Sequence, residues 1–233
     1  RGLFLANEVL DALSVERFTI GDDGIAQLQV SATPEGFAWH QSPCPGELQG
    51  KVERVLGDLD HRPAAGYRSE LNPHLPAWLE AVTGTLQNGL ALFIDYGYTR
   101  RDYYSPLRRD GTLICHYRHR VHSDPFSWPG LTDISASVDF TALAEAADEC
   151  ALDVCGYTTQ AMFLLETGLN DILRGLDDLE DAARLAVTNE IRRLTLPGEM
   201  GERFQLMALA RGLDDELCGS LQGFVDADMR YRL

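Results

Sequence analysis

The chain has 233 residues, of which 45% are hydrophobic and 24% are charged, as is typical of a globular protein. Its formal net charge of -16 argues against a nucleic-acid partner, because lysine and arginine supply the affinity for a phosphate backbone. The longest apolar runs are shorter than the roughly 18 residues that a bilayer requires, so we expect no membrane partner and no transmembrane helix.

The first part of the chain predicts a buried strand followed by a small antiparallel insert. Residues 2–6 read as a short apolar strand. The turn Gly21-Asp22-Asp23-Gly24 is typical of a hairpin, and apolar and polar residues alternate on both sides of it. We expect a β-rich insert over residues 15–60, whereas residues 42–72 are rich in proline, glycine and charge and read mostly as loop.

The middle of the chain predicts an α/β unit. A helix begins near Asn72, which can cap it, and the pair Asn88-Gly89 ends it. Its apolar stripe has helical spacing and consists of Leu75, Trp78, Leu79, Val82 and Leu86. The run LALFIDYG at residues 90–97 is apolar on both faces, which is typical of a strand inside a parallel sheet covered by helices.

The remaining elements complete an α/β fold. Residues 112–122 look extended, residues 152–157 and 203–210 read as strands, and a helix follows Asp139. A further helix spans about 177–195, with an acidic start and a basic end that match the helix dipole. We expect a single domain over residues 1–233, with a helical insert at 169–196 before the last strand.

Polar side chains follow the two strands that we assign to a parallel sheet. Asn7, Glu8 and Asp11 come after the first strand, and Asp95 follows the second. Ligands of open α/β sheets bind beyond the carboxyl ends of the strands, so these groups are candidates for one cleft. The alternative is that Asn7 caps a helical turn and Glu8 is solvated.

Other titratable groups give weaker signals. Glu70 precedes a helix and could act there or only favour the helix start. His116, His119 and His122 are spaced by three, which alternates faces on a strand, so we expect no metal site. The five cysteines are scattered without a Cys-x-x-Cys pair, and we expect reduced thiols of an intracellular protein.

Several blocks in order along the chain resemble the MidA family of S-adenosylmethionine-dependent methyltransferases, which includes a mitochondrial arginine methyltransferase. The matching stretches are ANEVLDALSVERF (6–18), YRSELNP (67–73), LFIDYG (92–97), GTL (111–113), HRVHSDPFSWPGLTDISASVDF (119–140), TTQAMFLLETG (158–168) and PGEMGERFQLMAL (197–209). The family also carries a Gly-rich cofactor turn after its first strand, and this chain contains no such turn.

The resemblance implies part of a class I, Rossmann-like methyltransferase sheet with extra C-terminal helices. Residues 3–6 would be strand four and residues 90–95 strand five, with 152–157 and 203–210 as the closing antiparallel pair. The cofactor would be S-adenosylmethionine, bound mostly by residues upstream of Arg1, with Asn7 as a possible contact within the chain. The chain alone would then be inactive, and the first strand would be an exposed edge.

The resemblance also implies a protein substrate with an exposed arginine. Carboxylates bind a guanidinium bidentately and accept its proton, so Glu8 and Asp11 are the catalytic candidates, with Asn7 positioning them. The weaker candidates for substrate binding are Asp95, Glu70, His119 and His122. A homodimer is possible, and the location would be the cytoplasm of a bacterium or the mitochondrion of a eukaryote. The rival hypotheses are a non-catalytic assembly or binding module and a carboxylate-based metal hydrolase.

Overall fold

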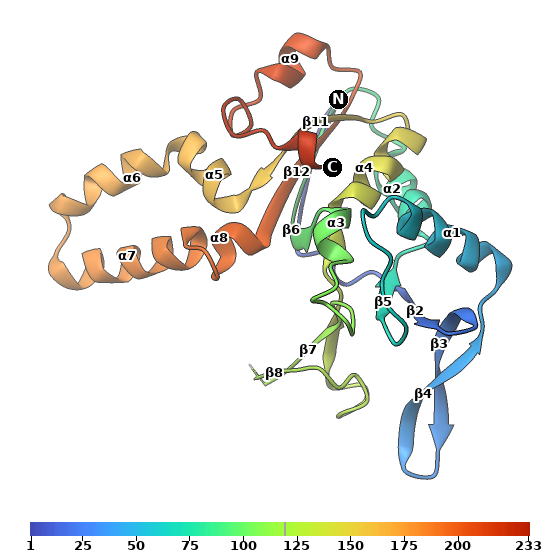
Figure 1. The fold of residues 1–233 in the computed structure, drawn as a ribbon. Coiled ribbons are helices and arrows are strands. Elements are labelled where there is room, and N and C mark those ends of the chain that lie inside the picture. Colours follow the sequence, from blue (N-terminus) through green and yellow to red (C-terminus); the bar gives the residue numbers. More distant parts are fainter. Residues whose placement is uncertain (119) are drawn as a thin grey trace. The chain divides into compact units, whose positions relative to one another are not determined.

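The computed structural model describes residues 1–118 and 120–233 and confirms the α/β class (Figure 1). The chain forms two compact units, and each is built from segments that are separate in the sequence. Unit 1 comprises Arg1–Glu8, Pro76–Gly97 and Phe140–Leu233, and unit 2 comprises Val9–Leu75 and Tyr98–Asp139.

Unit 1 is built on a mixed sheet in the strand order β1-β6-β12-β11. The strands are β1 (Gly2–Asn7), β6 (Gly89–Tyr98), β11 (Asp153–Thr159) and β12 (Phe204–Arg211). β1 runs parallel to β6, while β12 runs antiparallel to both β6 and β11, which confirms the predicted parallel pair and the closing antiparallel pair. In this order β1 is an edge strand, and its Leu3 and Leu5 are 69% and 66% exposed.

Unit 1 also contains helices and short helical turns, some of which pack on this sheet while others lie away from it (Figure 1). They are α2 (Leu75–Thr83), α4 (Phe140–Glu149), α5 (Gln160–Leu164), the π-helix η1 (Leu165–Leu169), α6 (Asn170–Arg174), the 3-10 turn η2 (Gly175–Asp178), α7 (Asp181–Thr195), α8 (Met200–Arg203), α9 (Asp215–Gly219) and the 3-10 turn η3 (Arg230–Arg232). α2 packs on the sheet through Trp78, whose ring lies 6.2 Å from that of Phe93. It ends at Thr83, before the predicted stop at Asn88-Gly89, because Gly84 interrupts it.

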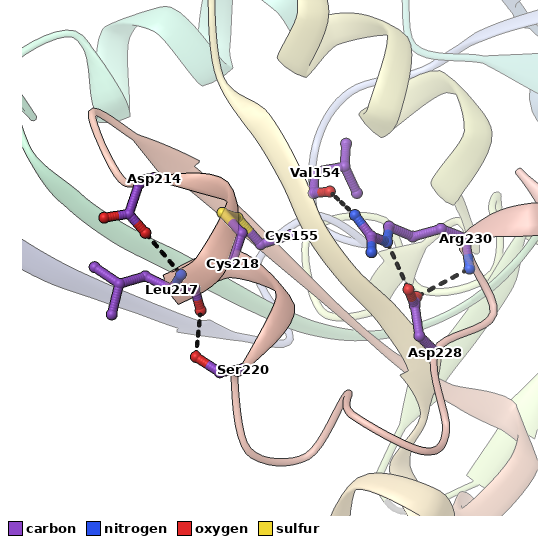
Figure 2. Close-up of a disulfide and its surroundings, with 8 residues drawn as sticks. All are labelled: Val154, Cys155, Asp214, Leu217, Cys218, Ser220, Asp228 and Arg230. Carbon is purple, nitrogen blue, oxygen red and sulfur yellow. Dashed lines mark hydrogen bonds and ion pairs between the residues drawn. A yellow bond between two sulfur atoms is a disulfide. The ribbon is translucent and has the colours of Figure 1, made fainter.

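A disulfide in unit 1 corrects the expectation that all five cysteines are reduced. Cys155 of β11 and Cys218 of α9 are bonded, with their Cα atoms 4.8 Å apart, although 63 residues separate them in the sequence (Figure 2). Cys155 belongs to a buried cluster with Leu206, Ala208, Ala210 and Phe224. The pairing follows from the packing of the C-terminal segment on β11, which the scattered sequence positions did not reveal.

Unit 2 contains two antiparallel sheets. The four-stranded sheet has the order β4-β3-β2-β5 and the three-stranded sheet the order β8-β7-β9. The strands are β2 (Glu16–Gly21), β3 (Gly24–Thr33), β4 (Gly36–Pro43), β5 (Arg68–Leu71), β7 (Ile114–Tyr117), β8 (Arg120–His122) and β9 (Asp133–Ser135). The two-residue strand β10 (Val138–Asp139) belongs to neither of these sheets. The hairpin at Gly21 and Gly24 is confirmed, whereas the single extended segment expected over 112–122 is divided into β7 and β8.

The loop expected over residues 42–72 is wrong in two places. The segment contains helix α1 (Gly46–Gly57) and strand β5. A separate short helix, α3 (Arg100–Tyr103), follows β6. α1 forms because Leu48, Val52 and Val55 share one buried face. That face packs against one side of the four-stranded sheet in a core that contains Phe18, Ile20, Leu48, Val52, Val55, Tyr67, Tyr103 and Tyr104.

Candidate functional site

Asn7 and Glu8 lie at the carboxyl end of β1, where β1 pairs with β6. Asn7 is opposite Ile94 in the parallel ladder, and the backbone N–H of Glu8 donates to the carbonyl oxygen of Ile94 at 2.9 Å. Both side chains are exposed, and Asn7 Nδ2 donates to Glu8 Oε1 at 3.3 Å. Glu8 has a φ of 51°, which is uncommon for a residue other than glycine. The structure therefore presents an oriented carboxylate at the edge where ligands of open α/β sheets bind.

Asp95 is next to this position but does not end its strand. Asn7 pairs with Ile94, so Asp95 is the following residue on β6. The ladder with β12 includes Asp95, which lies opposite Gln205, and continues to Tyr96, while β6 itself ends at Tyr98. The Asp95 carboxylate is fully buried and accepts the N–H of Tyr96 at 2.9 Å. Asp95 thus lies under the carboxyl edge rather than in an open cleft.

Asp11 falls in unit 2, in a turn that follows β1. Its side chain is buried, and its backbone oxygen accepts the N–H of Ala136 at 3.0 Å. The catalytic role of Asp11 stays a prediction.

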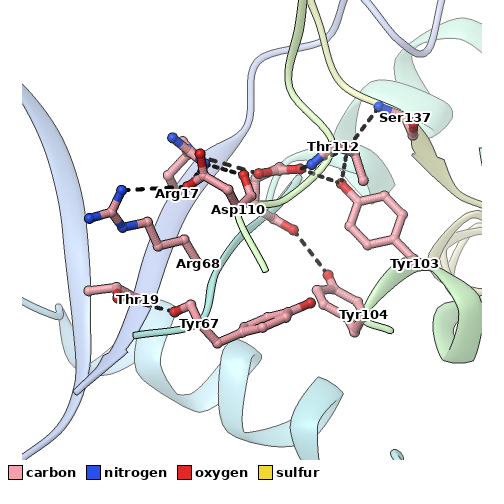
Figure 3. A network of polar contacts seen from close by, with 10 residues as sticks. Arg17, Thr19, Tyr67, Arg68, Tyr103, Tyr104, Asp110, Thr112 and Ser137 are labelled. Carbon is pink, nitrogen blue, oxygen red and sulfur yellow. Dashed lines mark hydrogen bonds and ion pairs between the residues drawn. The ribbon is translucent and has the colours of Figure 1, made fainter. Parts of the chain in front are cut away.

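Glu70 lies inside unit 2 and is 0% exposed. Its Oε1 accepts the backbone N–H of Thr112, the Thr112 hydroxyl at 2.7 Å and the Tyr103 hydroxyl at 3.3 Å. Its Oε2 is 3.5 Å from Nε of Arg17, whose Nη2 donates to the carbonyl oxygen of Asp110 at 2.6 Å. Figure 3 shows Arg17 and Arg68 both directed toward Asp110, and Tyr103 and Thr112 joined by a hydrogen bond.

This environment makes Glu70 a carboxylate enclosed by protein. Burial raises the pKa of the Glu70 carboxyl, and the hydrogen bonds from Thr112 and the charge of Arg17 act in the opposite direction. The contacts fasten β5 to residues 103–112, so they contribute to the packing of unit 2. Arg17, Tyr103 and Thr112 had no local sequence signal, because only the pairing of β2 with β5 brings Arg17 opposite Glu70.

Of the two histidine candidates, the structure describes His122, the last residue of β8. The ring of His122 meets the edge of Trp128 with centroids 5.5 Å apart, and Trp128 stacks on Tyr117 at 4.7 Å. His119 lies outside the described residues. Within residues 1–118 and 120–233, no group of three or more histidines, cysteines and carboxylates could hold a metal ion. No helix in the same residues is long and apolar enough to cross a membrane.

Comparisons with known proteins agree with the α/β fold. Residues 1–158 match the model of a family described as "Putative S-adenosyl-L-methionine-dependent methyltransferase". A protein of Burkholderia thailandensis crystallised with S-adenosyl-homocysteine is 36% identical, with a TM-score of 0.87, over 100% of this chain and 58% of that chain.

Two curated relatives are mitochondrial proteins. The protein arginine methyltransferase NDUFAF7 of Danio rerio is 28% identical over 225 residues, which are 89% of this chain and 47% of the relative. Its counterpart in Rattus norvegicus is 29% identical over 218 residues, which are 88% of this chain and 45% of the relative. The chain spans about half the length of these relatives. The family match over most of the chain leads to one conclusion: this chain belongs to a family of S-adenosyl-L-methionine-dependent methyltransferases.

Proposed function

We propose that this chain takes part in the methylation of arginine side chains of proteins, and that Glu8 binds the guanidinium that receives the methyl group. The supporting observation is the position of Glu8 at the carboxyl end of β1, where its carboxylate is exposed and oriented by Asn7. The arginine specificity is carried by the similarity to relatives that are named arginine methyltransferases.

The chemistry of a guanidinium explains why a carboxylate is needed there. The group is always charged at neutral pH and is a weak nucleophile. A carboxylate can bind two of its N–H groups and hold the third nitrogen for attack. As the new N–C bond forms, that nitrogen must lose a proton, and a nearby carboxylate can accept it. Bound S-adenosylmethionine would supply the methyl group.

Glu8 is preferred over the other carboxylates because of exposure. Asp95 and Glu70 are both fully buried, so neither reaches an external guanidinium in this structure. Asp11 remains a catalytic candidate on the sequence resemblance alone, because its side chain is buried in unit 2. Asn7 is the candidate for contact with the cofactor. We propose that most cofactor contacts come from the part of the related proteins that lies outside the region matched by this chain.

The test compares Glu8→Gln with Glu35→Gln in a protein of the full family length, at saturating cofactor. Glutamine keeps the size of Glu8 but loses its charge, so methyl transfer to an arginine-bearing protein should fall about 30- to 1,000-fold. Glu35 is also exposed but lies in a turn of unit 2, so its variant should keep full activity. Binding of S-adenosyl-homocysteine should be unchanged in both. Full activity of Glu8→Gln would remove Glu8 from the mechanism, whereas no transfer by the unsubstituted protein would favour a non-catalytic docking role.

The proposal also concerns the partner and the place of action. The substrate would be a protein with an exposed arginine, in the cytoplasm of a bacterium or the mitochondrion of a eukaryote. The chain alone should bind S-adenosylmethionine weakly, since it contains no Gly-rich turn after a strand. Calorimetry on the 233-residue chain that gave micromolar affinity would contradict this assignment of the cofactor site.

A further inference from the structure

Glu8 has a backbone conformation that its surroundings must hold in place. Its φ of 51° lies in the left-handed region, which a glutamate keeps only where neighbouring contacts impose it. The φ and ψ of a residue are fixed only when the peptide planes on both sides of it are held. On one side, the N–H of Glu8 is fixed on β6 by the carbonyl oxygen of Ile94 at 2.9 Å. The constraint on the other side must come from the segment that follows Glu8.

The segment after Glu8 is anchored inside unit 2. Leu10 and Asp11 are 6% and 8% exposed, and the backbone oxygen of Asp11 accepts the N–H of Ala136 at 3.0 Å. Ala136 comes directly after β9 and is itself buried. Because Asp11 is only three residues beyond Glu8, its attachment to Ala136 limits the conformations of the residues between them.

Ala136 is held in turn by the residue that follows it. The N–H of Ser137 donates to the hydroxyl oxygen of Thr112 at 3.0 Å (Figure 3). This contact continues the antiparallel pairing of β7 with β9, in which Ile114 is opposite Ser135. Two residues further, the same register brings Thr112 opposite Ser137. The side chain of Thr112 therefore closes this end of the ladder.

Glu70 fixes the hydroxyl of Thr112. That hydroxyl donates to Glu70 Oε1 at 2.7 Å, and the backbone N–H of Thr112 donates to the same oxygen. Glu70 is fully buried, so water does not replace these donors. A hydroxyl that gives its one proton to a carboxylate keeps its lone pairs for the N–H of Ser137. We call this chain of contacts the Glu70 relay and define it by the residues Glu70, Thr112, Ser137, Ala136 and Asp11.

We propose that Thr112 is a positioning residue for methyl transfer: anchored on Glu70, its hydroxyl keeps Glu8 in the conformation that directs the carboxylate at the guanidinium. The inference rests on the proposed function, because the orientation of Glu8 matters only if Glu8 binds the substrate. Thr112 acts through the segment that ends at Asp11. The relay also gives the buried carboxylate of Glu70 a part in the reaction that requires no contact with the substrate.

The test compares Thr112→Val with Tyr104→Phe in a protein of the full family length. Each variant removes one hydroxyl that bonds Glu70. Thr112 bonds the carboxylate, whereas Tyr104 bonds the backbone oxygen at 3.1 Å and lies outside the relay. At saturating cofactor and equal folded fraction, the turnover number of Thr112→Val should fall at least about tenfold, because misplaced reacting groups are costly. That of Tyr104→Phe should stay within about twofold of the unsubstituted protein, since Glu8 stays in place.

Three further measurements separate positioning from a purely structural role. Thr112→Ser keeps the hydroxyl and should retain at least about half of the turnover number. Binding of S-adenosyl-homocysteine, measured by calorimetry, should be equal in all variants. Hydrogen exchange of the amides in residues 8–13 should be faster in Thr112→Val than in Tyr104→Phe. Equal turnover in Thr112→Val and Tyr104→Phe, or no recovery in Thr112→Ser, would overturn the proposal.

A double variant shows whether Thr112 acts through Glu8. If it does, adding Thr112→Val to Glu8→Gln should change transfer by no more than about twofold relative to Glu8→Gln alone. Effects that multiply would overturn the proposal and leave Glu8 in the mechanism. Full activity of Glu8→Gln would instead contradict the proposed function, and the positioning role would fall with it because Thr112 would have no carboxylate to orient.

Discussion

Gly111 offers a direct test of the buried carboxylate in unit 2. Its φ is +79°, and a Cβ added there would lie 2.8 Å from the carboxyl carbon of Glu70 and closer still to Oε2. Gly130 has the same φ of +79°, but an added Cβ would have nothing within 4 Å. Gly111→Ala and Gly130→Ala thus share the backbone penalty and differ in the contact with Glu70.

The magnitudes follow from what must move. An alanine in the left-handed region costs about 1 kcal/mol, and Gly130→Ala should lose no more than that. In Gly111→Ala the carboxyl group of Glu70 must also shift, although Thr112 and Tyr103 hold Oε1 and Arg17 faces Oε2. Weakening these charge-assisted contacts adds about 2–4 kcal/mol, for a total of about 3–5 kcal/mol.

Urea denaturation followed by circular dichroism would measure both losses. The expected result is a clear gap between the two variants, with the midpoint of Gly111→Ala well below that of Gly130→Ala. Equal destabilisation would show that Glu70 does not lie against Gly111 or moves aside without cost. Equal destabilisation would therefore refute the enclosed position of Glu70.

Two further predictions concern titration and redox state. Burial raises the pKa of the Tyr67 hydroxyl from 10.0 to about 12, and the charge of the Glu70 carboxylate acts in the same direction. The folded state therefore holds the proton more tightly than the unfolded state. The resulting stability is fully present below pH 10.0 and should be lost as the pH rises toward about 12. Tyr67→Phe should flatten part of that slope in thermal unfolding measured against pH, and an unchanged slope would contradict the assignment. Cys218→Ser removes a link that closes 63 residues and should cost about 2–4 kcal/mol. A reductant should lower the melting temperature of the unsubstituted chain but not that of Cys218→Ser; equal shifts in both would show that the bond is not formed.

Elements with local signals could be predicted from the sequence, whereas contacts set by distant segments could not. The hairpin at Gly21 and Gly24 was predictable because its turn residues and flanking alternation are adjacent. Helix α1 could not be predicted in this way. Gly46, Gly50 and Gly57 have low helix propensity, so the helical spacing of the apolar residues around Val52 gave no clear signal.

The candidate site shows the same division. The position of Glu8 at the end of β1 followed from a strand that stops at polar residues. The extension of β6 past Asp95 depends on β12, which lies more than a hundred residues further along the chain. The enclosure of Glu70 depends on the pairing of β2 with β5, and the bond between Cys155 and Cys218 on the packing of α9 against β11. These are tertiary contacts that no local pattern encodes.

Backbone conformation at Glu8 leads to a prediction that separates function from stability. A glutamate with a φ of 51° is held in a region that glycine enters freely, at a cost of about 1 kcal/mol. Its N–H already bonds Ile94, so a glycine would keep the backbone contact and lose only the side chain and the strain. Glu8→Gly should therefore leave the free energy of unfolding in urea unchanged or raise it by up to about 1 kcal/mol. Methyl transfer by the full-length protein should fall as in Glu8→Gln. A residue kept only for the fold would behave in the opposite way, since its removal would lower stability and leave transfer intact. Loss of both together would mean that the carboxylate supports the structure at the end of β1, and that the guanidinium is bound by another residue.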